Sequence, residues 1–522
     1  MKHVTILDST LRDGAQSEGI SFSVNDKLNI VTVLDELGIS IIEAGNPASN
    51  IKELEFFERA RELKLENSVL SAFGSTRRKD TPVENDPACI TLLEAGTPYV
   101  TIVGKCSSFQ VAEILQTTAE ENLNMIEETC RFFVENGRHV IFDAEHFFDG
   151  YNSDSSYALK ALNAAVSGGA YCLCLCDTNG GTLPQEIHNI TKKVCSEFGD
   201  IIIGIHAHND SDMATAASVL AVQAGASQVQ GTFLGFGERC GNANLSSIIP
   251  NLQIKLGYSC IPEEKLSELT SSALKISETA NVTLHKNMPF VGRSAFAHKA
   301  GMHMDAVLKE ASSFEHIDPS LVGNRRRFLM SEFTGRAAVL RKVLKLYPDF
   351  DRDSPVIDEI LHQIKEKEYL GFQYEGADAS LELIIRRLAE HFEPFFDLIS
   401  YKVLDELPYD NNRSATATIK LKVNGSIKIS ASDGEGPVNA LDSALRESLS
   451  QFYPILAKVR LVDYKVRVME PKYATAAQVR VLITSTDGTD VWTTVGVSKD
   501  IIEASWLALV DSIEHKLMNA GR

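Results

Sequence analysis

The chain has 522 residues, of which 44% are hydrophobic and 23% are charged. This length exceeds what one hydrophobic core usually supports, so two or more domains are expected, and the composition excludes a disordered or fibrous protein. The 51 Lys and Arg residues are outnumbered by 70 Asp and Glu residues, and the net charge of −19 argues against a nucleic-acid partner.

The N-terminal segment does not resemble a signal peptide, because Asp8 follows the first apolar residues before a hydrophobic region can form. No apolar run reaches the roughly 18 residues that a membrane span needs. Nine cysteines are too few and too scattered for a secreted disulfide framework. We therefore expect no membrane partner and a reducing, cytoplasmic environment.

The first 240 residues repeat a unit in which a short β-branched run precedes a segment of helical periodicity. Spacings of about 30 residues between such runs are typical of strand–helix units with a parallel sheet. Eight units predict an α/β fold, a (β/α)8 TIM barrel over residues 1–261, with an open doubly wound sheet as the alternative. The expected strands are residues 4–7, 40–42, 68–73, 99–103, 139–142, 171–176, 201–205 and 228–233, and helices are expected at 27–37 and 185–198.

Residues 262–413 are expected to form a helical linker region, since no alternation of apolar and polar residues typical of strands appears before about residue 400. This region is expected to complete the active site. Helix-breaking Pro and Gly residues separate its helical segments. The expected helices are residues 263–281, 331–346, 356–367 and 380–392.

The pattern changes at Ser414 to strands and helices. Asn424-Gly425 between runs at 415–423 and 426–431 is a strong hairpin signal, and a helix follows to residue 449. A similar order recurs with runs at 463–469, 478–484 and 491–497 and a helix from residue 500. Residues 414–522 are therefore expected to form a separate, duplicated α+β domain.

Ionisable residues gather at the carboxyl ends of the expected barrel strands, where a TIM barrel carries its active site. Such groups would be costly in a core that served packing alone. They are Asp8, Arg12 and Asp13 after the first strand, then Glu43, Lys105, Asp143, Glu145, Asp177, His206, His208, Glu238 and Arg239 after later ones.

The clearest of these signals is His206-x-His208. Residues i and i+2 of a strand point to the same face, so both imidazoles should project to one side. Imidazoles, the Asp13 carboxylate and the Asn242 amide together suit a divalent metal of intermediate hardness. Two solvated loop histidines are the alternative for the pair alone, but the groups at other strand ends favour a metal centre.

Other motifs have simpler interpretations. The Cys-x-Cys-x-Cys run at 172–176 lacks the spacing of a zinc cage and favours an inert buried strand. Lys105 is either a contact for a substrate anion or a solvated loop lysine. Gly-x-Gly at 434–436 lacks the third glycine of a dinucleotide fingerprint and follows no parallel strand. His298, His303 and His316 each have a structural interpretation as well as a functional one.

Three motifs together carry a family resemblance: Leu-Arg-Asp-Gly at 11–14, His-x-His at 206–208 and Gly-Glu-Arg-Cys-Gly-Asn at 237–242. They resemble the metal-dependent, acyl-CoA-condensing (β/α)8 family of 2-isopropylmalate, homocitrate and citramalate synthases. The resemblance continues through 295–305 and into the tail at 434–438 and 501–506, which looks like the family's regulatory domain. It covers nearly the whole chain.

Within the family, residues 72–78 and 142–151 look like the citramalate synthase branch. Ala15 stands where 2-isopropylmalate synthases usually carry Glu, and Arg293 replaces a more usual Glu. Phe314 occupies a place where some relatives have a Tyr with a catalytic role, so no tyrosine role is carried over.

The resemblance implies an acyltransferase that joins acetyl-CoA, pyruvate and water into (R)-citramalate and CoA, in isoleucine biosynthesis. The alternatives are the 2-isopropylmalate synthase reaction with 2-oxoisovalerate, in leucine biosynthesis, and the homocitrate synthase reaction. A related metal-dependent lyase would share the barrel but has no evident need of the tail. A biotin-dependent carboxyltransferase would need a Met-Lys-Met that is absent, and a non-catalytic amino-acid sensor would not need the barrel motifs.

The resemblance also implies a metal-binding role for four residues. Asp13, His206 and His208, with Asn242 adjacent, are expected to hold Mn²⁺, Mg²⁺, Co²⁺ or Zn²⁺. The ion would chelate the 2-oxoacid and polarise its ketone as a Lewis acid. The identity of the metal stays open.

Five residues are expected to act on the substrates. Arg12 would bind substrate and stabilise the charge that develops on oxygen during condensation. Glu145 and His303 are the candidates for the base that deprotonates the acetyl methyl group, and His303 would reach in from the other subunit of a homodimer. Thr178 would contact the 2-oxoacid carboxylate, and Phe73 would form a wall against larger side chains.

By the same resemblance, the tail is expected to bind isoleucine, the end product of the pathway, as a feedback inhibitor. Gly434 and Gly436 would let the backbone approach the ligand closely, and Pro437 would begin a helix whose N-terminal amides accept the ligand carboxylate. A dimerisation module that has lost its ligand is the alternative.

Overall fold

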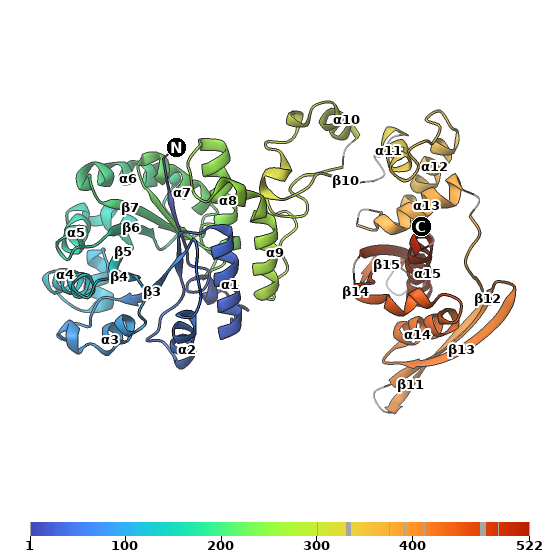
Figure 1. Cartoon of the computed structure of the whole chain (residues 1–522), viewed down its shortest axis with the longest axis horizontal. Helices are drawn as coiled ribbons and strands as arrows, with labels where there is room; N and C mark the ends of the chain where they lie inside the picture. Colours follow the sequence, from blue (N-terminus) through green and yellow to red (C-terminus); the bar gives the residue numbers. More distant parts are fainter. Residues whose placement is uncertain are drawn as a thin grey trace. The chain divides into compact units, whose positions relative to one another are not determined.

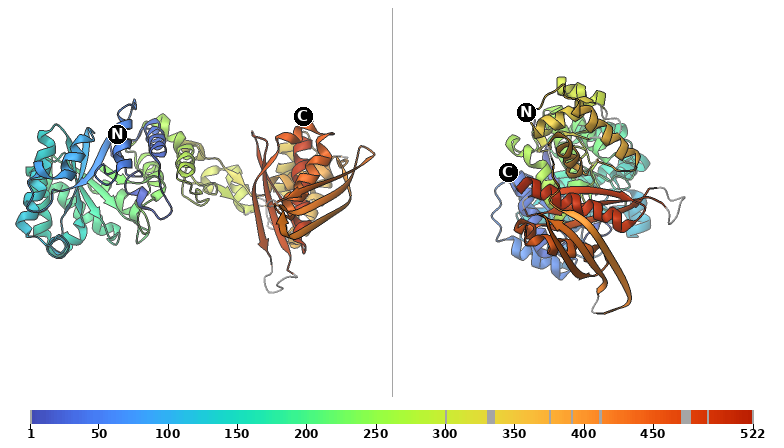
Figure 2. Two further views of the ribbon diagram at one scale, coloured as in Figure 1. Left: turned by 90° about the horizontal axis from the view of Figure 1, so that it is seen from below. Right: turned by 90° about the vertical axis from the view of Figure 1, so that its right-hand side faces the viewer.

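The computed structural model describes the chain except for residues 1, 300, 330–335, 375, 391, 411–412, 470–476, 489 and 521–522. The chain forms two compact units. The first comprises Met1–Phe296 with Ile317–Arg326, and the second comprises Ala297–His316 with Arg327–Arg522. Figures 1 and 2 show the two units, coloured from blue at the N-terminus to red at the C-terminus. Among the described residues, no helix is both long and apolar enough to cross a membrane.

Eight parallel strands close into a barrel in the first unit, because β1 pairs with both β2 and β8. This confirms the predicted (β/α)8 barrel and each of its eight expected strands, and it excludes the open sheet. The strands are β1 (Thr5–Asp8), β2 (Ile41–Glu43), β3 (Val69–Ser75), β4 (Tyr99–Lys105), β5 (His139–Glu145), β6 (Cys172–Asp177), β7 (Ile202–Ala207) and β8 (Gln228–Gly231).

Helices surround the barrel (Figure 1), and their ends follow from local sequence. Ser23 and Asp26 form a capping box at the start of α1, and Gly38 ends that helix in the left-handed region. Pro184 opens α6, as predicted. The helices are α1 (Val24–Leu37), α2 (Ile51–Ala60), α3 (Pro87–Glu94), α4 (Ala119–Glu135), α5 (Phe147–Ser167), α6 (Pro184–Phe198), α7 (Ala214–Ala224), α8 (Leu245–Pro250) and α9 (Leu269–Thr279).

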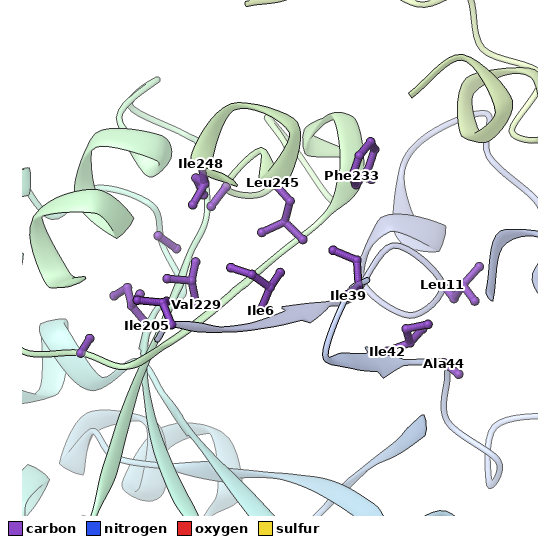
Figure 3. Packing of buried hydrophobic residues seen from close by; sticks show 14 of the residues in the cluster. Ile6, Leu11, Ile39, Ile42, Ala44, Ile205, Val229, Phe233, Leu245 and Ile248 are labelled. Carbon is purple, nitrogen blue, oxygen red and sulfur yellow. The ribbon is translucent and has the colours of Figure 1, made fainter. Parts of the chain in front are cut away.

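The main core lies between the barrel and its helices. Ile6 of β1, Val229 of β8 and Leu245 of α8 come together there and are fully buried (Figure 3). Alternate residues of the strands face the barrel interior instead, where Leu7 and Ile141 pack with the cysteines at 172, 174 and 176. Polar groups adjoin this small apolar cluster and carry the chemistry described below.

The linker helices fall in the second unit. α11 (Arg336–Leu346), α12 (Val356–Tyr369) and α13 (Asp378–Ala389) confirm three of the expected helices, although the start predicted at residue 331 lies outside the described residues. The fourth expected helix is α9, which belongs to the first unit and follows a 3-10 turn at Glu263–Glu268. The remaining short elements are β9 (Ala297–His298), α10 (Gly301–Lys309) and β10 (Arg327–Phe328).

Two strand–strand–strand–helix units follow and confirm the predicted duplication. In each, three antiparallel strands pack against a helix. Asn424 and Gly425 both have positive φ, as a tight hairpin turn requires. The elements are β11 (Asp397–Asp410), β12 (Arg413–Val423), β13 (Ser426–Gly434) and α14 (Pro437–Ser450), then β14 (Arg460–Val468), β15 (Val479–Thr486), β16 (Val491–Ser498) and α15 (Ile501–Ala520).

Strand β11 was not predicted. It lies within the region expected to be a helical linker, yet it pairs with β12, so the sheet begins at Asp397 and not at Ser414. A register shift between Leu398 and Ser400 interrupts the alternation of apolar and polar residues that would reveal it.

Candidate metal centre and active site

Three metal-donor side chains meet at the carboxyl end of the barrel. Asp13 follows β1, His206 lies on β7, and His208 comes just after that strand. The Nε2 atoms of His206 and His208 lie 3.4 and 3.9 Å from the same oxygen, Oδ2 of Asp13. The donor atoms all lie within 4.8 Å of one another, and the three residues are buried. The i, i+2 spacing of the histidines therefore brings both imidazoles to one carboxylate.

Metal binding needs an ionised carboxylate and neutral imidazoles, and Asp13 and His208 meet this requirement, whereas a metal must compete with a proton at His206. Burial alone would raise the pKa of Asp13, but the charge of Arg12 and the hydrogen bond from His206 hold it well below its usual range. Burial and the neighbouring His206 lower the pKa of His208 to about 4. For His206, the hydrogen bond and charge of Asp13 outweigh burial and raise the pKa.

Asn242 is a neighbour of the same carboxylate. Its Nδ2 donates to Asp13 Oδ1 at 3.0 Å and to the Phe236 carbonyl at 3.2 Å. Its buried Oδ1 has no hydrogen-bond partner within the described part of the chain. An orphaned oxygen beside an ionised carboxylate and two imidazoles is a donor set that fits a divalent cation.

The backbone of the loop after β8 packs closely against Asn242. Gly237 has a φ of +154°, and a Cβ added there would lie 2.2 Å from Asn242 Nδ2. A Cβ at Gly241 would lie 2.0 Å from the Gly235 carbonyl. The glycines of the Gly-Glu-Arg-Cys-Gly-Asn motif thus allow the backbone approach that positions Asn242.

Arg12 is held between two carboxylates and a ring. Its Nε donates to Glu43 Oε2 at 2.6 Å, and its Nη1 donates to Asp13 Oδ2 at 3.0 Å. The guanidinium carbon lies 4.1 Å from the centroid of the Phe73 ring. Glu43 also accepts a hydrogen bond from the hydroxyl of Ser9. The sequence marked Glu43 as a strand-end residue but did not reveal that it orients Arg12.

Two further predicted residues lie at the same end of the barrel. Glu145 ends β5, and its Oε2 lies 2.5 Å from Nζ of Lys105, at the end of β4. Thr178 follows β6, and its hydroxyl oxygen accepts a hydrogen bond of 2.8 Å from the His146 amide. The ion pair gives Lys105 a partner in Glu145, and its ammonium group has further donors for a substrate anion.

The second unit contains the other predicted residues. His303 lies on α10, where its ring stacks on that of Phe314 with a centroid separation of 4.1 Å. Gly434 ends β13, and a Cβ there would lie 2.3 Å from the Ala440 amide, so close packing already explains this glycine. A Cβ on Gly436 would meet nothing within 4 Å, and Pro437 begins α14.

The barrel interior holds polar groups that the sequence analysis did not assign to the site. Gln228 and Gln230 of β8 are fully buried, and Gln230 contacts both His206 and Asp143. Burial, with the nearby Glu43, raises the pKa of Asp143 to about 7. Two glutamines at alternate positions of an otherwise apolar strand were the sequence signal that could have indicated polar groups in the barrel interior.

The cysteines of β6 are buried, as predicted. Burial raises the pKa values of Cys172 and Cys174 well above the usual range, so both thiols stay protonated at neutral pH. Asp143, Cys174 and Cys176 also place donor atoms within 4.8 Å of one another, but protonated thiols are poor metal ligands.

Comparison with known proteins gives three matching family models. Residues 3–279 match the HMGL-like model, residues 290–369 match the homocitrate synthase post-HMGL domain-like model, and residues 375–517 match the LeuA allosteric (dimerisation) domain.

Similar proteins match over nearly the full length. The chain is 51% identical to the (R)-citramalate synthase of Aquifex aeolicus, over 99% of this chain and 98% of that protein. It is 48% identical to the (R)-citramalate synthase of Synechocystis, over 98% of this chain and 96% of the relative. Identity to the 2-isopropylmalate synthase of Methanocaldococcus jannaschii is lower, at 30%, over 98% and 94% of the two chains.

Loss of one imidazole should weaken metal binding. We expect His208→Ala to raise the dissociation constant for Mn²⁺ by about tenfold or more, because it removes a buried donor. Calorimetric titration of the metal-free full chain measures this constant. His188→Ala, which alters a histidine on the outer helix α6, should leave it unchanged. Equal Mn²⁺ affinity in His208→Ala and the unaltered chain would contradict the assignment.

Proposed function

Since the chain belongs to the HMGL-like family and, within it, to the (R)-citramalate synthases, we propose that its barrel joins acetyl-CoA and pyruvate at the centre formed by Asp13, His206 and His208. HMGL-like enzymes are metal-dependent, and the citramalate synthases among them are transferases that condense acetyl-CoA with a 2-oxoacid. The convergence of two imidazoles on one buried, ionised carboxylate is the observation that carries the proposal.

Asp13, His206 and His208 would hold a divalent metal ion, with Asn242 beside them. When bound, the ion supplies a Lewis acid that polarises the ketone of the 2-oxoacid. Asn242 keeps the Asp13 carboxylate oriented through its amide hydrogen bond. The donor types are compatible with Mn²⁺, Mg²⁺, Co²⁺ or Zn²⁺.

The condensation removes a proton from the acetyl methyl group, and the resulting carbon nucleophile adds to the ketone carbon of pyruvate. The ketone oxygen gains negative charge and takes up a proton to become the alcohol. Water then cleaves the thioester, which releases CoA and a carboxylate. Arg12 is suited to stabilise the oxygen charge, because Glu43 and Asp13 hold its guanidinium in place before the reaction.

We retain Glu145 and His303 as the candidates for the base. Glu145 lies at the carboxyl end of the barrel, where an incoming substrate would compete with Lys105 for its carboxylate. His303 belongs to the other compact unit, so its participation requires that unit, from the same or a partner chain. Thr178 would donate its hydroxyl hydrogen to the pyruvate carboxylate while its oxygen accepts from the His146 amide.

The preference for pyruvate is the direct test of this function. Phe73 packs against Arg12, and its ring would limit the space for the substrate side chain. We expect kcat/KM for pyruvate to exceed that for 2-oxoisovalerate by at least about tenfold, because the branched side chain of 2-oxoisovalerate would meet the Phe73 ring. Thiol release from acetyl-CoA with a panel of 2-oxoacids measures the ratio. Equal or better turnover of 2-oxoisovalerate would assign the chain to leucine synthesis instead.

The fork of Arg12 generates a second prediction. A guanidinium bridges two oxygens in one plane, and an ammonium group cannot reproduce that geometry. We expect Arg12→Lys to lower kcat by at least about tenfold, or roughly 1.4 kcal/mol of transition-state stabilisation. Steady-state kinetics with both substrates separate the possibilities. A raised KM with unchanged kcat would mean that Arg12 only binds substrate.

For the second unit we propose feedback inhibition by isoleucine and assembly as a homodimer. The match of residues 375–517 to an allosteric dimerisation domain supports both. Citramalate leads to isoleucine by way of 2-oxobutyrate, so isoleucine is the end product that such a domain would sense. Gly436 and Pro437 at the start of α14 would approach its carboxylate, and the alternative is a dimerisation domain without an effector.

A methyl group at Gly436 should interfere with the effector. The space around this position is open, and its φ of −172° is accessible to alanine, so Gly436→Ala should fold normally. We expect the isoleucine concentration for half-inhibition to rise by about fivefold or more, within the usual range of allosteric coupling. Ser432→Ala, on β13 of the same unit, serves as the control. If isoleucine neither binds by calorimetry nor inhibits the unaltered chain, only the structural role of the domain remains.

We also propose a cytoplasmic location. All nine cysteines are free thiols, and all but Cys195 and Cys240 are buried. Free thiols in this number fit a reducing compartment.

A further inference from the structure

Gln230 makes three hydrogen bonds inside the barrel that the proposed reaction does not use. Its Oε1 lies 3.0 Å from Nδ1 of His206, and its Nε2 lies 2.9 Å from Asp143 Oδ1 and 3.4 Å from Gln228 Oε1. All four residues are buried. A buried polar network of this kind is costly to disturb, because a group that loses its partner cannot turn to solvent.

The partners of Gln230 determine which way its amide faces. Only the amide nitrogen can donate, and both Asp143 and Gln228 present oxygen atoms to it. The Gln228 atom that faces Gln230 is Oε1, which also lies 3.5 Å from the thiol sulfur of Cys172. While Asp143 is ionised, a reversed Gln230 would set its oxygen against two acceptor oxygens. Its carbonyl oxygen therefore faces His206.

The orientation of Gln230 in turn selects the tautomer of His206. A carbonyl oxygen accepts only, so Nδ1 of His206 must carry the hydrogen. In the neutral imidazole, Nε2 is then the nitrogen available to a metal, and it is the one that lies 3.4 Å from Asp13 Oδ2. His208 has no comparable support, because its buried Nδ1 has no partner within the described residues.

We propose that Gln230 is a positioning residue that presents Nε2 of His206 to the metal, with its own orientation set by Asp143 and Gln228. This inference rests on the metal centre of the proposed function. The two histidines then differ in how their rings are oriented. Gln230 orients the His206 ring before a metal binds, whereas the His208 ring is oriented by the metal itself. Groups that orient a ligand in this way commonly change metal affinity by about 10- to 100-fold.

Gln230→Met tests the proposal, since it keeps the length of the side chain and removes both its acceptor and its donor. We expect the Mn²⁺ dissociation constant of the metal-free full chain to rise by about 10- to 100-fold. Calorimetric titration measures the constant, and the visible absorption of the Co²⁺-loaded chain reports whether the ligand geometry changes. Gln253→Met is the control, because the Gln253 side chain bonds to the backbone of residues 260 and 261.

A double variant that exchanges the amide and the carboxylate between positions 143 and 230 should restore the Mn²⁺ affinity. In Asp143→Asn with Gln230→Glu, the new carboxylate accepts from both His206 Nδ1 and the new amide. The Gln228 amide, whose Nε2 has no partner among the described residues, turns over to donate to the same carboxylate. The tautomer is then selected again with the same net charge. We expect its Mn²⁺ affinity to lie within about threefold of the unaltered chain. If Gln230→Met does not fold, the double variant and the unaltered chain decide the question.

The outcomes separate this inference from the proposed function. Wild-type Mn²⁺ affinity and an unchanged Co²⁺ spectrum in Gln230→Met would overturn the positioning role, as would a folded double variant with a tenfold loss. A chain that binds no metal at all, with or without His208→Ala, would instead overturn the metal centre itself.

Discussion

One buried carboxylate organises the active end of the barrel. Asp13 accepts from Arg12 through one oxygen and from Asn242 through the other, and both His206 and His208 direct Nε2 toward it. In a protein interior an ionised carboxylate persists only when such partners compensate its lost hydration. The barrel supplies those partners from three different strand ends. The functional assignment depends on that convergence.

The carboxylate also explains why the surrounding loops are built as they are. Glycines after β8 let the backbone close on Asn242, and Glu43 holds the far side of the Arg12 fork. A second layer, Gln230 with Asp143, orients His206 from inside the barrel. Each group is fixed by a neighbour from another strand, so the site is organised before substrate binds.

Much of this was predictable because it depends on short spacings. Strand–helix periodicity predicted the barrel, and the His206-x-His208 pattern predicted a shared face. The link from Glu43 to Arg12 and the contacts of Gln230 were not predictable, because they join residues far apart in sequence. Strand β11 was not predicted for a different reason. A register shift breaks the alternation of apolar and polar residues along it, and an edge strand tolerates a less regular alternation.

The central claim is that a metal ion held at Asp13 carries the condensation of acetyl-CoA with pyruvate. Asp13→Asn preserves shape and removes the charge, so it isolates the role of the carboxylate. The decisive measurement is CoA release from acetyl-CoA and pyruvate while Mn²⁺ is titrated into the metal-free chain and into Asp13→Asn. We predict saturable activation of the unaltered chain and no activation of Asp13→Asn over the same range. Full CoA release from the metal-free chain, or equal activation of Asp13→Asn, would contradict it.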